Sequence, residues 1–409
     1  MGAVEDVKRV LAQAGIHLMY NTFVDRPSVI VDGGQEHYLG DLDRAKIVIA
    51  VHDAKLKVHG PILDACIMDI AHSSTYHPVQ DYLNNQKWDG TPRIDTWLID
   101  YMGADDTPLV RAVGAIVLIA AVRRVRQPGC KFDECLVMVG KEGVGKSETI
   151  KALGGEWFSD SLPLGADPKI TVERTEGVWL CESAELVGNT PTKIAEIKAF
   201  LSRQIDGPYR KAYGRESDVR KRQFIPIATT NDSVFLHSVT GDRRFWPIKV
   251  YTGMHEKVMV DRNQLWAKAA QRERLGESIR LVPDLWDAAY EEQEKYRAED
   301  PWETKLRQLS GPTISLLNIW GHLGIPADRQ HGKDAQRIAG IMTKMGYLKS
   351  RKLMNGVRTT YYEISTPFHP ENFDRSPGWV DVEAPVQEGE DGGESLPEGV
   401  YLEHELEEL

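Results

Sequence analysis

Apolar residues are spaced differently in successive stretches of the chain, and this spacing predicts several structural units. Residues 28–31 and 45–50 are short apolar runs typical of strands, whereas residues 60–72 have the spacing of a helix. We therefore predict a small accessory α/β domain over residues 1–75. Residues 76–130 have helical spacing over most of their length, which predicts a helical collar.

Short apolar runs alternate with helical stretches over residues 131–296. The runs at residues 135–139, 177–181 and 224–229 have the length and composition of buried strands. A helical segment at residues 263–290 follows them. This alternation is typical of an α/β fold with a largely parallel sheet.

Residues 302–366 have the pattern of a separate unit. Apolar spacing predicts helices at residues 314–319 and 335–345, followed by two β-like runs that meet at Asn355-Gly356, a dipeptide typical of hairpins. This order predicts a winged helix-turn-helix-like domain, which either contacts DNA or serves only for packing or dimerisation. Its hairpin is basic, with Lys349, Arg351, Lys352 and Arg358.

The negative charge of the chain is concentrated near its C-terminus. The formal net charge is −11, and residues 381–409 contain eleven acidic residues and no Lys or Arg, so the remaining chain is formally neutral. We expect this acidic tail, which is rich in Glu and Gly, to be disordered. The overall acidity therefore does not exclude a nucleic-acid partner.

Cysteine spacing and the longest apolar run bear on the location of the protein. Cys66, Cys130, Cys135 and Cys181 form no C-x-x-C pair, which suits a reducing cytosol and predicts no zinc site. The longest apolar run, residues 113–122, is about half the length that spans a bilayer. We predict a buried helix there and no membrane partner.

Residues 140–147 read Gly-Lys-Glu-Gly-Val-Gly-Lys-Ser and match the phosphate-binding loop G-x-x-x-x-G-K-[ST]. The glycines permit a tight turn whose N–H groups face phosphate oxygens, and the following helix adds its positive dipole end. Lys146 is expected to reach the β- and γ-phosphates of ATP, and the Ser147 hydroxyl to hold Mg²⁺. The predicted nucleotide contacts are Gly140, Gly143, Val144, Gly145, Lys146, Ser147 and Glu148.

A carboxylate follows the second apolar run. An ATPase needs an acid at such a strand end to order Mg²⁺ and polarise water, and Glu182 takes this position. We therefore predict that Glu182 and Ser147 are the metal-binding residues. Glu185 either orients the water or pairs with a neighbouring base.

Polar residues also follow the third apolar run. Asn231 either hydrogen-bonds the γ-phosphate or attacking water, or only caps a turn. Beyond it, Arg243 and Arg244 carry the guanidinium groups that stabilise transferring phosphoryl charge, often from a neighbouring subunit. We expect one of them to be such an arginine finger and the other to pair with an acid.

A basic insert lies between the acid and Asn231. Residues 198–222 contain eight basic and three acidic residues together with two tyrosines. Basic residues interleaved with aromatic ones suit single-stranded DNA, because phosphates are neutralised while bases stack, and the alternative is a solvated loop. The residues that we assign to DNA binding are Lys198, Arg203, Arg210, Lys211, Tyr213 and Arg215.

These motifs, in this order, resemble the virulence-associated E family of phage and mobile-element proteins, which belongs to the superfamily 3 helicase group of AAA+ ATPases. The resemblance covers most of the chain. The matching segments are residues 77–83, 88–90, 128–131, 140–147, 179–186, 197–202, 213–215, 229–231 and 240–246.

The resemblance implies an AAA+ ATPase core and a ring, expected to be a homo-hexamer, that acts on DNA in the cytoplasm of a bacterial host cell. Asn231 matches the family's sensor position, and residues 198–215 overlap the segment whose hairpin faces the central channel. Only one acid ends the strand, so the roles of Glu182 and Glu185 stay open. No primase domain precedes the collar, so we expect any primase or other replication partner to come from another chain.

Our hypothesis is an ATP-dependent DNA helicase or translocase that acts as a ring on single-stranded or forked DNA in the replication of a phage or mobile element. One alternative is an ATP-regulated replication initiator or regulator that binds DNA, through the C-terminal unit, without unwinding it. Another is an interference ATPase that acts on replication proteins.

Overall fold

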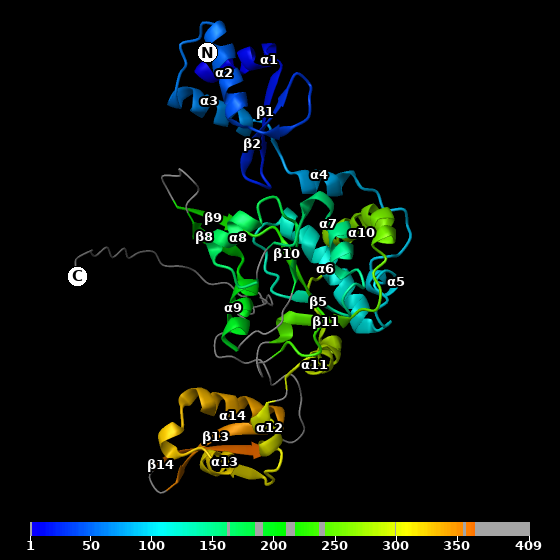
Figure 1. The fold of residues 1–409 in the computed structure, drawn as a ribbon, viewed down its shortest axis with the longest axis vertical. Helices are drawn as coiled ribbons and strands as arrows, with labels where there is room; N and C mark the ends of the chain where they lie inside the picture. The colour runs from blue at the N-terminus through cyan, green and yellow to red at the C-terminus, as the bar shows by residue number, and fades with distance from the viewer. Residues whose placement is uncertain are drawn as a thin grey trace, which may run out of the picture. The chain divides into compact units, whose positions relative to one another are not determined.

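The computed structural model describes residues 2–161, 164–184, 191–209, 217–236, 242–298, 300–354 and 357–364. Helices and strands alternate in the central part of the chain, and the parts before and after it contain small sheets of their own (Figure 1). The predicted acidic tail and the Asn355-Gly356 turn lie outside the described residues.

The N-terminal part contains a four-stranded sheet in the order β3-β2-β1-β4 and three helices. One prediction is wrong here, because the run at residues 45–50 lies in a helix. In this helix Ile47 and Val51 are one turn apart and both are buried, so the run has the periodicity of a helix with one buried side. The elements are α1 (Ala3–Gln13), β1 (Ile16–Asn21), β2 (Arg26–Val31), β3 (His37–Tyr38), α2 (Asp41–Asp53), α3 (Pro61–His72) and β4 (Thr75–Tyr76).

The next part is helical, as predicted, with α4 (Pro78–Asn85), α5 (Trp97–Asp100) and α6 (Pro108–Arg126). Residues 113–122 of α6 are all buried, which confirms the predicted buried helix. No helix in the described ranges is long and apolar enough to cross a membrane.

A five-stranded sheet forms the centre of the fold, and all of its strand pairs are parallel, as the sequence predicted. Its order is β11-β5-β10-β7-β6, so by position in the chain the strands run fifth, first, fourth, third, second. The strand predicted at residues 177–181 begins later, because Gly177 has a φ of 71° and ends a turn. The strands are β5 (Cys135–Val139), β6 (Phe158–Ser159), β7 (Leu180–Ala184), β10 (Ile225–Thr230) and β11 (Phe245–Lys249).

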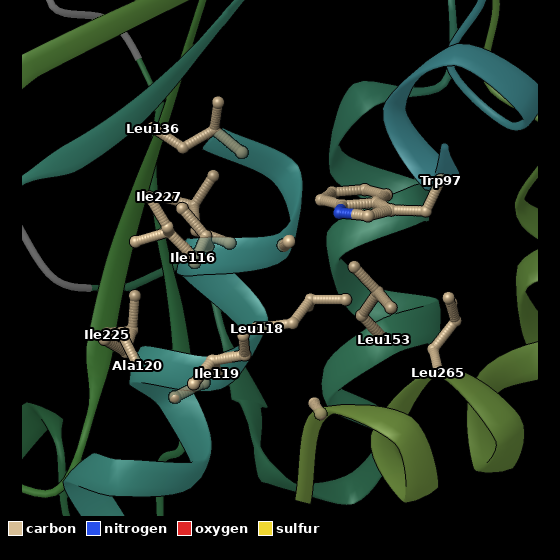
Figure 2. Close-up of a cluster of buried hydrophobic side chains, with 14 of the residues drawn as sticks. Trp97, Ile116, Leu118, Ile119, Ala120, Leu136, Leu153, Ile225, Ile227 and Leu265 are labelled. Carbon is tan, nitrogen blue, oxygen red and sulfur yellow. The ribbon is translucent and has the colours of Figure 1, made fainter. Parts of the chain in front are cut away.

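Alternate residues of these strands face two different layers. Leu136, Ile225 and Ile227 join the cluster that contains α6, α7 (Lys146–Gly154) and α10 (His255–Arg274). Figure 2 shows Ile116 and Ala120 of α6 toward the strand residues, and Leu118 toward Leu153. The collar helix α6 and the sheet therefore share one hydrophobic core.

The opposite face of the sheet packs against α9 (Pro191–Ser202), through Ile197, Phe200 and Leu201. After α9 the chain forms an antiparallel hairpin of β8 (Ile205–Tyr209) and β9 (Asp218–Lys221). A short helix, α8 (Pro168–Arg174), packs against β8.

The single helix predicted at residues 263–290 is two helices, α10 and α11 (Trp286–Glu294). The chain leaves the helical conformation after Arg274, because Gly276 has a φ of 77° and Pro283 begins a separate short turn. Gly276 and Pro283 are helix breakers that the sequence shows, so the prediction of one segment gave too much weight to the apolar residues around them.

The C-terminal part has its own hydrophobic cluster, which includes Ile319, Ile338 and Tyr362. The predicted order of two helices and a hairpin is present, although the first helix begins only at Leu316 because the preceding residues pair with β14. The elements are α12 (Pro301–Leu306), β12 (Thr313–Ser315), α13 (Leu316–Leu323), α14 (Gly332–Lys344), β13 (Tyr347–Met354) and β14 (Val357–Ile364).

Candidate nucleotide site

The predicted phosphate loop connects β5 to the N-terminus of α7, at the carboxyl end of the parallel strands. Two glycines are required by the geometry. Gly145 has a φ of 86°, and a Cβ at Gly140 would lie 2.5 Å from the carbonyl oxygen of Val250. Thr149 closes the first turn of α7, since its hydroxyl donates to the carbonyl of Gly145 at 2.8 Å. These contacts hold the loop tightly against the end of the sheet.

A segment that the sequence did not indicate supports the loop from the other side. A Cβ at Gly253 would lie 2.5 Å from the carbonyl oxygen of Val144 and 2.7 Å from that of Gly145. The same segment receives the collar, because the N–H groups of Tyr251 and Thr252 donate to the carbonyl of Met102 at 3.0 and 3.2 Å. No motif marks these residues, because their role depends on where β11 ends beside β5.

The Lys146 ammonium lies within the loop. Its Nζ donates to the carbonyls of Gly140 at 2.7 Å and Lys141 at 2.9 Å. Partial burial lowers the pKa of Lys146, and the carboxylates of Glu182 and Glu142 oppose this effect. The ammonium is therefore placed where phosphate oxygens can replace the two carbonyls as acceptors.

Three side chains from three different elements meet beside the loop. The hydroxyl of Ser147 donates to Oε1 of Glu182 at 2.7 Å, and the hydroxyl of Thr229 donates to the same oxygen at 2.7 Å. Glu182 is buried on β7, and β10 lies between β7 and the loop strand β5. The structure thus brings the predicted acid and the predicted metal-binding serine together and adds Thr229, which the sequence had not assigned to the site.

The Ser147 and Glu182 oxygens are suitable ligands for Mg²⁺. A hydroxyl and a carboxylate are hard donors, and Mg²⁺ is commonly held by one or two carboxylates together with phosphate oxygens. Within the described ranges no group of three or more His, Cys, Asp or Glu side chains could hold a metal ion. A nucleotide-dependent magnesium site needs no such group.

Asn231 directly follows β10 at the same edge of the sheet. Thr230, the preceding residue, pairs with Val139 of β5, and its carbonyl accepts a hydrogen bond from the N–H of Gly140 at 3.1 Å. The Asn231 side chain is exposed. Asn231 and Glu182 are therefore carried by adjacent strands, and Asn231 follows the strand that touches the phosphate loop.

The two predicted arginines differ in their surroundings. Arg244 is partly buried, and its Nε lies 3.2 Å from Oδ2 of Asp133 and 3.1 Å from the hydroxyl of Ser202. Arg243, the preceding residue, is exposed. Arg244 thus pairs with an acid, and Arg243 is the more exposed of the two arginines.

The basic insert is only partly described. Lys198 is largely buried, and its Nζ lies 2.8 Å from Oδ1 of Asp242. Arg203 donates to the carbonyl of Ala166 at 2.9 Å. Both predicted DNA contacts are therefore engaged within the chain in this structure. Five other predicted site residues lie outside the described ranges, namely Glu185, Arg210, Lys211, Tyr213 and Arg215.

Comparison with known proteins gives a family and a similar fold. A comparison with curated proteins finds no match. The chain is similar to the apo structure of the NrS-1 C terminal region (305-718), with 11% identity and a TM-score of 0.50, over 88% of this chain and 98% of that one. An A-form apo structure of the same region gives 12% identity and a TM-score of 0.48, over 88% of this chain and 99% of that one.

At such low identity the similarity concerns the fold alone. The family model described as virulence-associated protein E-like domain matches residues 83–298, which is more than half of the 409 residues. The matched range includes the phosphate loop, the acid strand and both arginines. The chain therefore belongs to the virulence-associated protein E-like family.

Proposed function

We propose that the protein is an ATP hydrolase with an AAA+ core of the superfamily 3 helicase type. In this proposal it uses ATP and Mg²⁺ to move along single-stranded or forked DNA, as a helicase or translocase in the replication of a phage or mobile element. Family membership, the parallel sheet and its fifth-first-fourth-third-second strand order support this assignment.

The observation that carries the proposal is the contact between Ser147 and Glu182. These residues are 35 positions apart, yet the serine hydroxyl of the phosphate loop donates to a buried carboxylate on another strand at 2.7 Å. A buried acid against the loop serine suits a nucleotide site, where both side chains would hold the cation that accompanies the phosphates.

Each side chain has a defined task in this proposal. Lys146 binds the β- and γ-phosphates, and the loop N–H groups hold the remaining phosphate oxygens. Ser147 and Glu182 would hold Mg²⁺, which would supply charge neutralisation of the phosphates. Asn231 orients the attacking water, with Glu185 as a candidate to assist, and Arg243 stabilises the transferring phosphoryl group on a neighbouring subunit.

An arginine that acts on the nucleotide of the neighbouring subunit implies a ring. The family resemblance implies six subunits. Such an interface is heterologous, and a heterologous interface closes into a ring when its rotation permits. The β8–β9 hairpin, whose two strands are separated in sequence by Arg210, Lys211 and Arg215, is our candidate for contact with the DNA phosphates. A separate primase is a candidate partner.

Substitution of Lys146 tests the proposal. We expect Lys146→Ala to lower ATP hydrolysis at least a hundredfold, because removal of one transition-state charge contact costs about 2.7 kcal/mol or more. The measurement is phosphate release with Mg²⁺, with and without single-stranded DNA. Lys151→Ala is the control, since Lys151 is exposed on the same helix and carries the same charge. Normal hydrolysis by Lys146→Ala would contradict the assignment.

A second candidate function is a DNA-binding initiator or regulator whose ATP site only controls assembly. The observation that favours it is the small C-terminal unit, whose β13–β14 hairpin carries the exposed Lys349, Arg351 and Arg358. Replacing these three residues by Gln in the full chain separates the two functions. A motor keeps ATP-driven strand displacement, whereas a tethered binder loses DNA association altogether.

A further inference from the structure

The short turn that carries Arg243, Asp242–Arg244, is held by contacts on both of its sides. Asp242 is 3% exposed, and its carboxylate lies 2.8 Å from Nζ of Lys198 and 3.4 Å from Nη2 of Arg297. Burial raises the pKa of Asp242, and Lys198 and Arg297 oppose this effect. One end of the turn is thus fixed by a buried ion pair with α9.

The other end of the turn contacts the same helix. Nε of Arg244 lies 3.1 Å from the hydroxyl of Ser202 and 3.2 Å from Oδ2 of Asp133, whose other oxygen is 3.2 Å from Nη1 of Arg280. Lys198 and Ser202 are one helical turn apart, and the Ser202 hydroxyl donates to the carbonyl of Lys198 at 2.9 Å. Arg243, which is exposed, therefore lies in the chain between two residues that α9 holds.

The base of the β8–β9 hairpin is fixed to the same stretch of α9. Arg222 is buried and makes a bidentate pair with Asp206, at 2.6 and 2.7 Å. Its Nη1 donates to the carbonyl of Phe200 at 2.5 Å, and its guanidinium lies 4.3 Å from the centre of the Phe200 ring and 5.2 Å from that of Phe224. A bidentate pair with ring contacts on a buried arginine resists bending at this junction.

One turn of α9 thus contacts both the arginine turn and the hairpin base. Lys198 and Ser202 hold the arginine turn, and Phe200, between them in sequence, holds the hairpin through Arg222. The contacts of Asp242 and Arg222 are buried and that of Arg244 is partly buried, and closely packed groups transmit a displacement better than loose side chains do.

We propose that α9 mechanically couples the DNA-binding hairpin to Arg243, and that Lys198 is a positioning residue for Arg243 and not a DNA contact. This inference rests on the proposed function, in which Arg243 acts on the nucleotide of the neighbouring subunit. It corrects our assignment of Lys198 to DNA binding, which its side-chain exposure of 14% and its pairing with Asp242 do not favour.

Substitution of Lys198 by methionine tests the coupling. Lys198→Met keeps the apolar stem but removes the ion pair, so we expect DNA-stimulated ATP hydrolysis to fall at least tenfold, while DNA affinity and its dependence on salt stay unchanged. A DNA contact gives the opposite result, namely weaker binding and a salt slope that falls by about one. That result, or normal DNA stimulation, would overturn the inference.

Three control variants accompany this test. Lys198→Arg preserves the ion pair and should restore stimulation. Lys169→Met removes a charge from a side chain that is 68% exposed and should behave as the unmodified protein. The double variant Lys198→Met, Asp242→Asn leaves no unpaired carboxylate behind. If its melting temperature is unchanged and its DNA-stimulated hydrolysis is still low, the low hydrolysis arises from lost positioning and not from unfolding.

Mixed rings distinguish failure of the coupling from failure of the proposed function. Lys198→Met subunits keep their phosphate loop, and Lys146→Ala subunits keep a correctly held Arg243. An interface that joins these two intact parts should be active. If subunits mix randomly at a heterologous interface, a one-to-one mixture should therefore regain up to about a quarter of normal hydrolysis. An Arg243→Ala plus Lys146→Ala mixture is the reference. If ATP hydrolysis recovers only in the reference mixture, the coupling is wrong. If it recovers in neither mixture, both the action of the arginine in trans and the coupling that depends on it are wrong.

Discussion

Thr229 and Ser147 donate to the same oxygen of Glu182, and this arrangement fixes the orientation of the carboxylate. A buried acid with a single hydroxyl partner can rotate about its terminal torsion, since this torsion is broad. The second hydroxyl, from the strand between the acid and the loop, removes that freedom. Thr229 is thus a positioning residue for Glu182.

Replacement of Thr229 by valine should show this effect. Thr229→Val keeps the shape but removes a hydrogen bond to a carboxylate, so we expect the free energy of unfolding to fall by about 2 kcal/mol. We also expect ATP hydrolysis to require a higher Mg²⁺ concentration, because the carboxylate is less well oriented. Urea unfolding and a Mg²⁺ titration of hydrolysis measure the two effects.

The control for this prediction is Thr171→Val. Thr171 is buried as Thr229 is, but its hydroxyl donates to the backbone carbonyl of Asp167 at 2.7 Å. A neutral acceptor implies a loss of about 1 kcal/mol and no change in the Mg²⁺ requirement. An unchanged Mg²⁺ requirement in Thr229→Val as well would show that Ser147 alone orients the acid.

At the scale of elements, the sequence predicted best what depends on neighbouring residues. The loop at residues 140–147, its strand and its helix follow from local glycines and an apolar run, and all three are present. The helix at residues 41–53 was missed because a six-residue apolar run fits a strand or a helix, and packing against α1 within the N-terminal cluster decides between them. Local pattern does not contain that information.

The parts of the site that the sequence did not reveal depend on strand order. Thr229 meets Glu182 only because β10 inserts between β5 and β7, and Gly253 supports the loop only because β11 ends beside β5. The prediction that Lys198 contacts DNA rests on the basic and aromatic residues around it and on the family resemblance, and nothing in its sequence neighbourhood indicates Asp242, 44 positions later. These contacts join distant segments, and a single sequence gives no measure of such distances.

The start of helix α4 depends on an uncharged histidine. Nδ1 of His77 accepts from the N–H of Gln80 at 3.3 Å, which places the ring proton on Nε2, where it donates to Oε1 of Gln223 at 2.8 Å. Burial lowers the pKa of His77, and the contact with Gln223 opposes this effect. A second proton on Nδ1 would abolish the cap.

Stability should consequently fall in mild acid. The pKa of His77 in the folded chain lies below the ordinary value of 6.5, so the unfolded chain binds more protons and the contribution of His77 is lost as pH falls below about 6.5. Between pH 7.5 and 5.5 we expect this loss to be up to about 1 kcal/mol. His77→Asn also caps a helix but does not titrate, so its urea-unfolding free energy should fall less over the same interval. Equal losses in both proteins would exclude His77 as the source.

At the scale of the whole molecule, charge is divided between a neutral body and an acidic C-terminal segment. The chain carries −11 and residues 381–409 carry −11, so residues 1–380 carry −11 − (−11) = 0. The body also contains the local excess of positive charge in the basic insert. A phosphate backbone that approaches the insert is therefore attracted locally but repelled by the segment at longer range.

Removal of residues 381–409 should for this reason strengthen DNA binding at low salt, by roughly tenfold near 20 mM. It should have little effect near 0.5 M salt, because charges more than about 5 Å apart are screened there. Fluorescence anisotropy with a labelled single strand measures the affinity at each salt concentration. A 409-residue protein with every Asp and Glu of the segment replaced by Asn or Gln separates the effect of charge from that of bulk. If this neutral variant binds as the truncated protein does, repulsion is the cause. If only truncation strengthens binding, the segment acts by occupying space. Equal affinity of all three proteins for DNA at low salt would mean that the insert is shielded from the segment's charge.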